Sequence, residues 1–291
     1  MKRITASTAG LALGLSISAI SLQAANTTAG EDRADYSPYL QHDHPDRVLW
    51  GDTHLHTSYS TDAGMIGNTL GPDAAFRLAR GETVTASAGA RARLIRPLDF
   101  LVVADHAENL GLAPLIAESD PQLLDRPWGK AIHDLVKAGK VYEAYSMWGA
   151  EMSKRKDPLD DAKLVRSVWN RLVESAERFN EPGLFTALHG FEYTSVPEAN
   201  NLHRVVVFRD DADKVRDLVP FSNYDSADPE DLWGWLQAYE EDKRGRVMAI
   251  PHNGNLSNGL MFDNTTPDGK PLTADYARRR AQWEPLYEVT Q

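Results

Sequence analysis

Short apolar segments alternate along the chain with amphipathic ones, a pattern that predicts a mixed α/β fold. Residues 98–104 form an almost continuous apolar run, as expected for a strand that is buried on both faces. Further apolar runs predict strands over residues 47–56, 185–194, 204–208 and 246–250, and a strand-like segment over residues 286–290.

Helices are predicted between these strands. Residues 72–80 begin with Pro and stop at Gly81, and residues 228–243 begin with an Asp N-cap followed by Pro and two acids. From about residue 113 to 180, apolar positions recur at helical spacing, so this interval predicts a helical insertion. A last helix is predicted over residues 274–282.

Histidines and acids stand at the ends of the predicted strands. His54 and His56 are two residues apart at the end of the first strand, so they project from the same face. Such strand ends carry the sites of α/β proteins, and imidazoles together with carboxylates suit divalent ions. The sequence therefore predicts a metal site here, with further candidates Asp62, His106, Glu192, His203 and His252.

Composition narrows both the chemistry and the partners. The 291-residue chain has a formal net charge of −11, and binding to nucleic acid is disfavoured because phosphate contacts need a basic surface. It contains no cysteine, so a metal site must be built from His, Asp and Glu.

The first 25 residues have the pattern of a secretory signal peptide. Lys2 and Arg3 give a basic start, residues 11–22 an apolar run, and residues 23–25 a small-residue cleavage site. The apolar run is too short to span a membrane comfortably. We therefore expect a periplasmic or secreted protein that leaves the membrane after cleavage, with an irregular leader over residues 26–46.

Three motifs together resemble those of a known family. They are GDTHLHT over residues 51–57, ADHAE over residues 104–108 and GFEYT over residues 190–194. With Asp62, His203 and Pro251-His252 they follow the motif order of the PHP (polymerase and histidinol phosphatase) superfamily. The closest resemblance is to its exported branch, domain of unknown function 3604, and we take residues 47–291 as one PHP-like domain.

The resemblance implies a distorted (β/α)7 barrel that holds two or three Mn, Fe or Zn ions at the C-terminal end of its strands. It implies that Glu192 bridges the metals and that Asp105 orients an imidazole or a water. Known members hydrolyse phosphoesters, and paired metals suit that reaction because they activate water and clamp both reacting oxygens. The implied ligands are His54, His56, Asp62, His106, Glu192, His203 and His252.

The chain departs from the family pattern in one respect. That pattern ends with an Asp-x-His on a late strand, and no such motif follows His252. We therefore expect an N-terminal portion of a longer protein, with a barrel that is incomplete at its C-terminus and with weak or absent activity.

The substrate is expected to be a small molecule. An anionic group would be compatible with the negative chain if bound metal attracts it. Arg204, Asn253 and Asn255 lie next to ligand candidates in the sequence and are the candidates for holding such a group.

Two other functions remain open. An amidohydrolase-type barrel also begins with His-x-His, but the Gly-x-Glu at residues 190–192 and the lack of a candidate carboxylated Lys argue against it. A non-catalytic module that binds metal or carbohydrate would draw on the tryptophans, which include Trp148, Trp233, Trp235 and Trp283.

Overall fold

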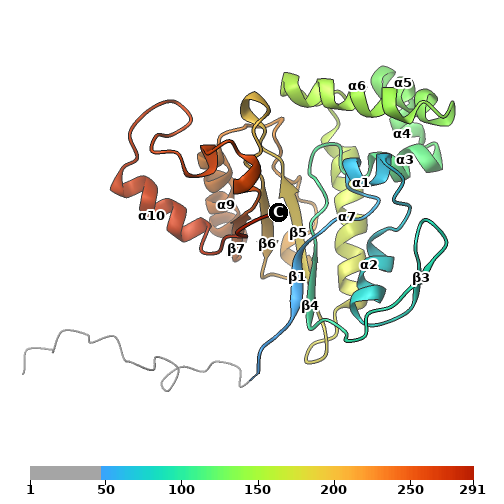
Figure 1. The fold of residues 1–291 in the computed structure, drawn as a ribbon, viewed down its shortest axis with the longest axis horizontal. Coiled ribbons are helices and arrows are strands. Elements are labelled where there is room, and N and C mark those ends of the chain that lie inside the picture. The colour runs from blue at the N-terminus through green and yellow to red at the C-terminus, as the bar shows by residue number, and fades with distance from the viewer. Residues whose placement is uncertain (1–46) are drawn as a thin grey trace, which may run out of the picture. The chain divides into compact units, whose positions relative to one another are not determined.

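The computed structural model describes residues 47–291 of the chain (Figure 1). The predicted signal peptide over residues 1–25 and the predicted leader over residues 26–46 lie outside the described residues. The chain divides into the units Met1–Val48 and Leu49–Gln291, and every helix and strand of the described residues belongs to the second unit. None of the helices in the described residues 47–291 is long and apolar enough to cross a membrane.

Five strands form one mixed sheet, in the order β1-β4-β5-β6-β7. β4 runs parallel to both β1 and β5, whereas β6 is antiparallel to β5 and to β7. Two very short strands, β2 and β3, pair separately. The bounds are β1 (Gly51–Leu55), β2 (Val84–Thr85), β3 (Arg91–Ala92), β4 (Phe100–Val103), β5 (Thr186–Tyr193), β6 (Arg204–Phe208) and β7 (Val247–Pro251).

The predicted (β/α)7 barrel is wrong: the described residues form a curled, half-barrel sheet with β1 and β7 at its two edges. The reason lies between β5 and β6. Parallel neighbours need a long crossover, usually a helix, but residues 194–203 contain only the short 3-10 turn Pro197–Ala199. β6 therefore turns back antiparallel to β5.

Helices follow the predicted pattern closely. The helices predicted over residues 72–80, 228–243 and 274–282 correspond to α2, α9 and α10, and the predicted helical interval 113–180 corresponds to the five helices α3 to α7, the first of which begins at Leu112. The bounds are α1 (Thr61–Met65), α2 (Pro72–Ala79), α3 (Leu112–Glu118), α4 (Pro121–Leu124), α5 (Pro127–Lys137), α6 (Val141–Lys154), α7 (Ala162–Phe179), α8 (Ala212–Val215), α9 (Pro229–Lys243) and α10 (Ala274–Trp283).

Helices pack along the whole width of the sheet. α2 and α7 pack against β4 and β5, while α9 and α10 pack against β7 (Figure 1). In chain order, α1 follows β1 directly and α3 follows the loop after β4. The loop between β1 and α1 and the loop between β4 and α3 both begin at the C-terminal ends of parallel strands. Their polar residues therefore leave the sheet at the same end of its strands.

The alternation of side chains sorts the sheet into two faces. In β4, Leu101 and Val103 belong to the large core that includes the helices, whereas Val102 lies in a smaller cluster on the other face. We call this second face the inner face; its buried residues are Val102, Ala104, Val205, Val207 and Ile250.

Candidate metal centre

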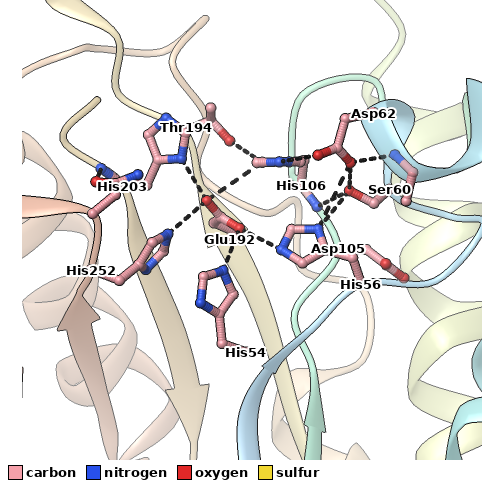
Figure 2. A network of polar contacts seen from close by, with 12 residues as sticks. His54, His56, Ser60, Asp62, Asp105, His106, Glu192, Thr194, His203 and His252 are labelled. Carbon is pink, nitrogen blue, oxygen red and sulfur yellow. Dashed lines mark hydrogen bonds and ion pairs between the residues drawn. The ribbon is translucent and has the colours of Figure 1, made fainter. Parts of the chain in front are cut away.

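Five imidazoles and two carboxylates converge at one end of the sheet, where β1, β4, β5 and β7 end (Figure 2). Alternation continues from the inner face into the strand ends, which places Glu192 with Leu188 of that face and His252 with Ile250. The structure thus brings together every predicted metal ligand, namely His54, His56, Asp62, His106, Glu192, His203 and His252.

The antiparallel strand β6 explains how His203 joins this group. Arg204, the first residue of β6, pairs with Tyr193 at the end of β5 and with Pro251 at the end of β7. The residue before β6 therefore lies at the same end of the sheet as the last residues of β5 and β7. His203 consequently reaches Glu192, with Nδ1 2.7 Å from Oε1.

Glu192 stands at the centre of the cluster, and each of its oxygens faces a different pair of imidazoles. Oε1 is 2.7 Å from Nδ1 of His203 and 2.9 Å from Nε2 of His252. Oε2 is 2.8 Å from Nε2 of His56 and 3.3 Å from Nε2 of His54. A carboxylate placed between two sets of imidazoles in this way, together with those imidazoles, would be a set of donors suited to holding divalent cations.

The charges of the metal-free cluster follow from burial and from mutual contact. Burial alone would raise the pKa of Glu192, but the positive charge of His106 and hydrogen bonds from the other imidazoles hold it well below its usual value. Burial likewise opposes a charge on His106, yet Glu192 and Asp62 raise its pKa to about 10. For His203 and His252 burial dominates and lowers the pKa, so both rings are neutral at pH 7.

The ring proton of His56 is held away from Glu192. The hydroxyl of Ser60 donates to Oδ1 of Asp62 at 2.6 Å, so it accepts from Nδ1 of His56, 2.8 Å away. Nε2 of His56, the other ring nitrogen, lies 2.8 Å from Oε2 of Glu192. A divalent ion held by both atoms would suit a contact of this length.

The residues of the cluster fit a divalent metal by a second criterion. Nε2 of His203 and Nδ1 of His252 are buried and have no hydrogen-bond partner. Buried polar atoms are normally paired, and neutral imidazole nitrogen is a preferred ligand of Zn and Fe. The separations of about 2.8–3.3 Å between donor atoms also match the spacing of neighbouring ligands that each lie about 2.0–2.2 Å from a metal.

Asp105 acts on the loop rather than on an imidazole. Its Oδ1 accepts from the backbone N–H of Thr57 at 2.5 Å, and its Oδ2 accepts from the Thr57 hydroxyl at 2.7 Å. Asp105 is fully buried, and burial raises its pKa to about 6 against the lowering effect of both Thr57 bonds. Its hydrogen bonds therefore position the residue that follows His56.

The three predicted substrate residues, which neighbour ligand candidates in the sequence, all have partners within the chain. Arg204 is buried, and its Nε donates to Glu284 at 3.0 Å. Asn253 is buried and accepts a hydrogen bond from the backbone of His203, which makes it a support for that ligand. Asn255 is exposed and exchanges two hydrogen bonds with the backbone of Gln291.

Several contacts of the cluster were missed from the sequence. Ser60 holds His56, Thr194 bonds Nδ1 of His106, and Glu288 accepts from Nδ1 of His54 at 2.9 Å. Hydroxyl residues of this kind give no signal in a single sequence. Glu288 could have been found from the sequence. It is an acid inside the apolar segment 286–290, and an acid in an apolar strand is the pattern that identified Glu192 as a candidate.

Fold and site together define an α/β protein with a candidate metal centre made of imidazoles and carboxylates. The chain belongs to the family described as "Protein of unknown function (DUF3604)", which matches residues 43–291. This confirms the predicted membership of domain of unknown function 3604. No curated protein and no solved structure matches the chain.

Proposed function

We propose that this protein is an exported metal-dependent hydrolase of the PHP superfamily, that it acts on a phosphoester, and that the cluster around Glu192 is its active site. The observation that carries the proposal is the position of Glu192, which is 1% exposed and faces four imidazole nitrogens within 3.3 Å. Surrounding one buried carboxylate with imidazoles is costly unless protons or metal ions neutralise it.

The donor atoms divide into groups that suit more than one ion. His54, His56 and Glu192 form one group, and His106, Glu192 and His203 form another. Divalent ions held there would supply Lewis acidity and lower the pKa of a water. The protein's own part is to fix the imidazoles, through Ser60 for His56 and through Glu192 for both groups.

Access to the cluster is uneven, and this indicates the direction from which a substrate arrives. The side chain of Asp62 is 38% exposed and that of His56 is 19% exposed, whereas His252 is fully buried. We therefore infer that a phosphoester meets the cluster on the side of α1, where Asp62 lies, with the sheet behind it.

The carbohydrate-module alternative gains no support from Trp148, Trp233 and Trp283, three of the four tryptophans named for it. Trp233 is fully buried and its Nε1 donates to Glu284, and Trp283 and Trp148 are also buried in the core. A sugar platform needs exposed aromatic faces, which these three side chains do not offer.

The test is metal content per chain, measured by elemental mass spectrometry after reconstitution with Mn, Fe or Zn. We expect at least two ions per wild-type chain and their loss in the double variant His54→Ala/His56→Ala. A histidine outside the cluster provides the matched control: His133, which bonds Ser119 and Asp134, should be replaceable by Ala without loss of metal.

The loaded protein is then assayed with p-nitrophenyl phosphate and bis-p-nitrophenyl phosphate. Turnover that requires metal and disappears in the double variant supports a phosphoesterase. A wild-type chain that takes up no metal would overturn the proposal, and a loaded chain that turns over neither compound would overturn its phosphoester part.

A further inference from the structure

Glu288 lies beside the cluster although it is far from the other members in the sequence. It belongs to the segment that follows α10, and its backbone N–H donates to the carbonyl of Pro251 at the end of β7, at 3.0 Å. The neighbouring ring of Tyr287 packs edge-on against Phe262, with 4.9 Å between ring centroids. These contacts fix the place at which the carboxylate of Glu288 enters the site.

The carboxylate of Glu288 contacts Nδ1 of His54, the outer nitrogen, which is the ring nitrogen on the side away from Glu192. Oε2 of Glu288 accepts from Nδ1 of His54 at 2.9 Å, while Nε2 on the other side of the ring faces Oε2 of Glu192 at 3.3 Å. When the ring carries a single proton and that proton is held on Nδ1, the Nε2 lone pair is directed into the cluster. A carboxylate in that position also makes the ring a stronger donor to a metal.

We propose that Glu288 is a positioning residue of the metal centre, which holds His54 in the tautomer and orientation that present Nε2 to a divalent ion. The inference rests on the proposed function, because it assigns Glu288 a part in the same site. Ser60 does the corresponding work for His56 with a neutral hydroxyl, 2.8 Å from Nδ1. His54 is thus the member of the His-x-His pair whose outer nitrogen is held by a charge.

A direct role as ligand is the competing explanation, since donor atoms of His54, His252 and Glu288 lie within 4.8 Å of one another. The two roles differ in one measurable respect. A positioning residue acts through His54, so its removal has no further effect once His54 is gone. A ligand contributes its own bond to the metal, so its removal weakens binding with or without His54.

The experiment measures Zn²⁺ affinity by competition with a chromophoric chelator in the full chain. The variants are Glu288→Ala, Glu288→Gln, His54→Ala and His54→Ala/Glu288→Ala, with Glu82→Ala as the control for loss of a surface acid that pairs with Arg77. We expect Glu288→Ala to weaken Zn²⁺ binding roughly 10- to 100-fold. Glu288→Gln keeps an oxygen that accepts the Nδ1 proton, so it should recover part of that loss, and Glu82→Ala should bind as wild type.

The double variant decides between the two roles. Affinity equal to that of His54→Ala alone supports positioning, and a further drop of tenfold or more assigns Glu288 as a ligand and overturns the inference. Wild-type affinity in Glu288→Ala, with metal bound normally by the wild type, overturns the inference and leaves the proposed function standing. If the wild type binds no metal, both the inference about Glu288 and the proposed function are overturned.

Nitrogen NMR of the zinc-loaded protein gives a readout that does not depend on affinity. The expected result is a protonated Nδ1 and a metal-bound Nε2 for His54 in the wild type and in Glu288→Gln. If His54 binds zinc through Nδ1 in the wild type, the positioning role is excluded.

Discussion

Both carboxylate oxygens of Asp105 accept hydrogen bonds from Thr57, one from the backbone N–H at 2.5 Å and one from the hydroxyl at 2.7 Å. The contact joins the end of β4 to the loop after β1, across 48 residues of sequence. His56 directly precedes Thr57, and His106 directly follows Asp105. One buried contact therefore sets the separation of two candidate ligands.

The first prediction concerns this contact. In Asp105→Asn the amide nitrogen cannot accept a hydrogen bond, so one of the two bonds is lost and a buried donor is left facing another donor. We expect a loss of about 1–3 kcal/mol in the free energy of unfolding, together with weaker metal binding. Denaturant unfolding of the metal-free chain and a zinc titration measure the two effects.

Thr57→Ser is the control for this prediction, because it keeps both donors to Asp105 and should behave almost as wild type. If Asp105→Asn unfolds at the same denaturant concentration as the wild type, the contact does not hold the loop as the structure indicates.

The second prediction concerns Gly190, two residues before Glu192 on the same face of β5. A Cβ there would collide with the side chain of Val102 on β4 and with the carbonyl of Val206 on β6. Gly190→Ala should therefore cost about 1–3 kcal/mol of stability through overpacking. It should also weaken metal binding, since β5 must shift and it carries Glu192. Thermal unfolding and a metal titration test both expectations.

Gly149 in α6 provides a matched glycine, because a Cβ at that position meets nothing within 4 Å. Gly149→Ala should be neutral or stabilising by up to about 1 kcal/mol, since alanine favours a helix more than glycine does. Equal behaviour of the two variants would contradict the close approach of the strands around Gly190.

The candidate site could be predicted further from the sequence than the fold that carries it. His54, His106, Glu192 and His252 were found because each stands at or just beyond the end of an apolar strand, and an α/β protein brings such strand ends together at one end of the sheet. His203 was found although it precedes its strand. It lies with the others because β6 runs antiparallel, which the sequence pattern alone does not reveal.

The same reversal explains why the barrel prediction failed. The barrel was expected from the family resemblance alone. Periodicity could not correct that expectation, because it identifies strands and helices but carries no information on strand direction. Partners of buried charges were equally hidden from the sequence. Arg204 stood next to a ligand candidate and was interpreted as a substrate residue, whereas alternation directs it to the face opposite His203.

The third prediction tests the role of Arg204. Its guanidinium pairs with Glu284 and also donates to the carbonyl of Leu202, and both charged side chains are almost fully buried. Arg204→Ala would leave the Glu284 carboxylate with only part of its contacts. Breaking such a pair typically costs about 3–5 kcal/mol, so we expect a large drop in the thermal midpoint.

Metal content per folded chain separates this structural role from a role in substrate binding. We expect Arg204→Ala to retain its metal at temperatures where it remains folded. A variant with wild-type stability and a raised KM for a phosphoester would contradict the structural role and indicate that Arg204 binds substrate.

The fourth prediction is a pH dependence of the metal-free protein that metal abolishes. Glu192 and Asp62 raise the pKa of His106 from 6.5 to about 10 against the effect of burial, so the folded chain holds this proton more tightly than the unfolded chain. The stabilisation is fully present below about pH 6.5 and is lost as the pH rises through about 10, with a slope of at most about 1.4 kcal/mol per pH unit. Bound metal needs neutral imidazole, so the loaded protein should lack this slope.

Denaturant unfolding between pH 6 and 9.5, with EDTA or with excess zinc, measures this dependence. His106→Gln removes the titrating group, so its metal-free stability should be lower at pH 6 and should fall less steeply above that pH. Asp62 and Glu192 still face position 106 in that variant, and any slope that remains belongs to other groups. An unchanged slope in His106→Gln would show that the proton is not held on His106, and the charge distribution described for the metal-free cluster would then be wrong.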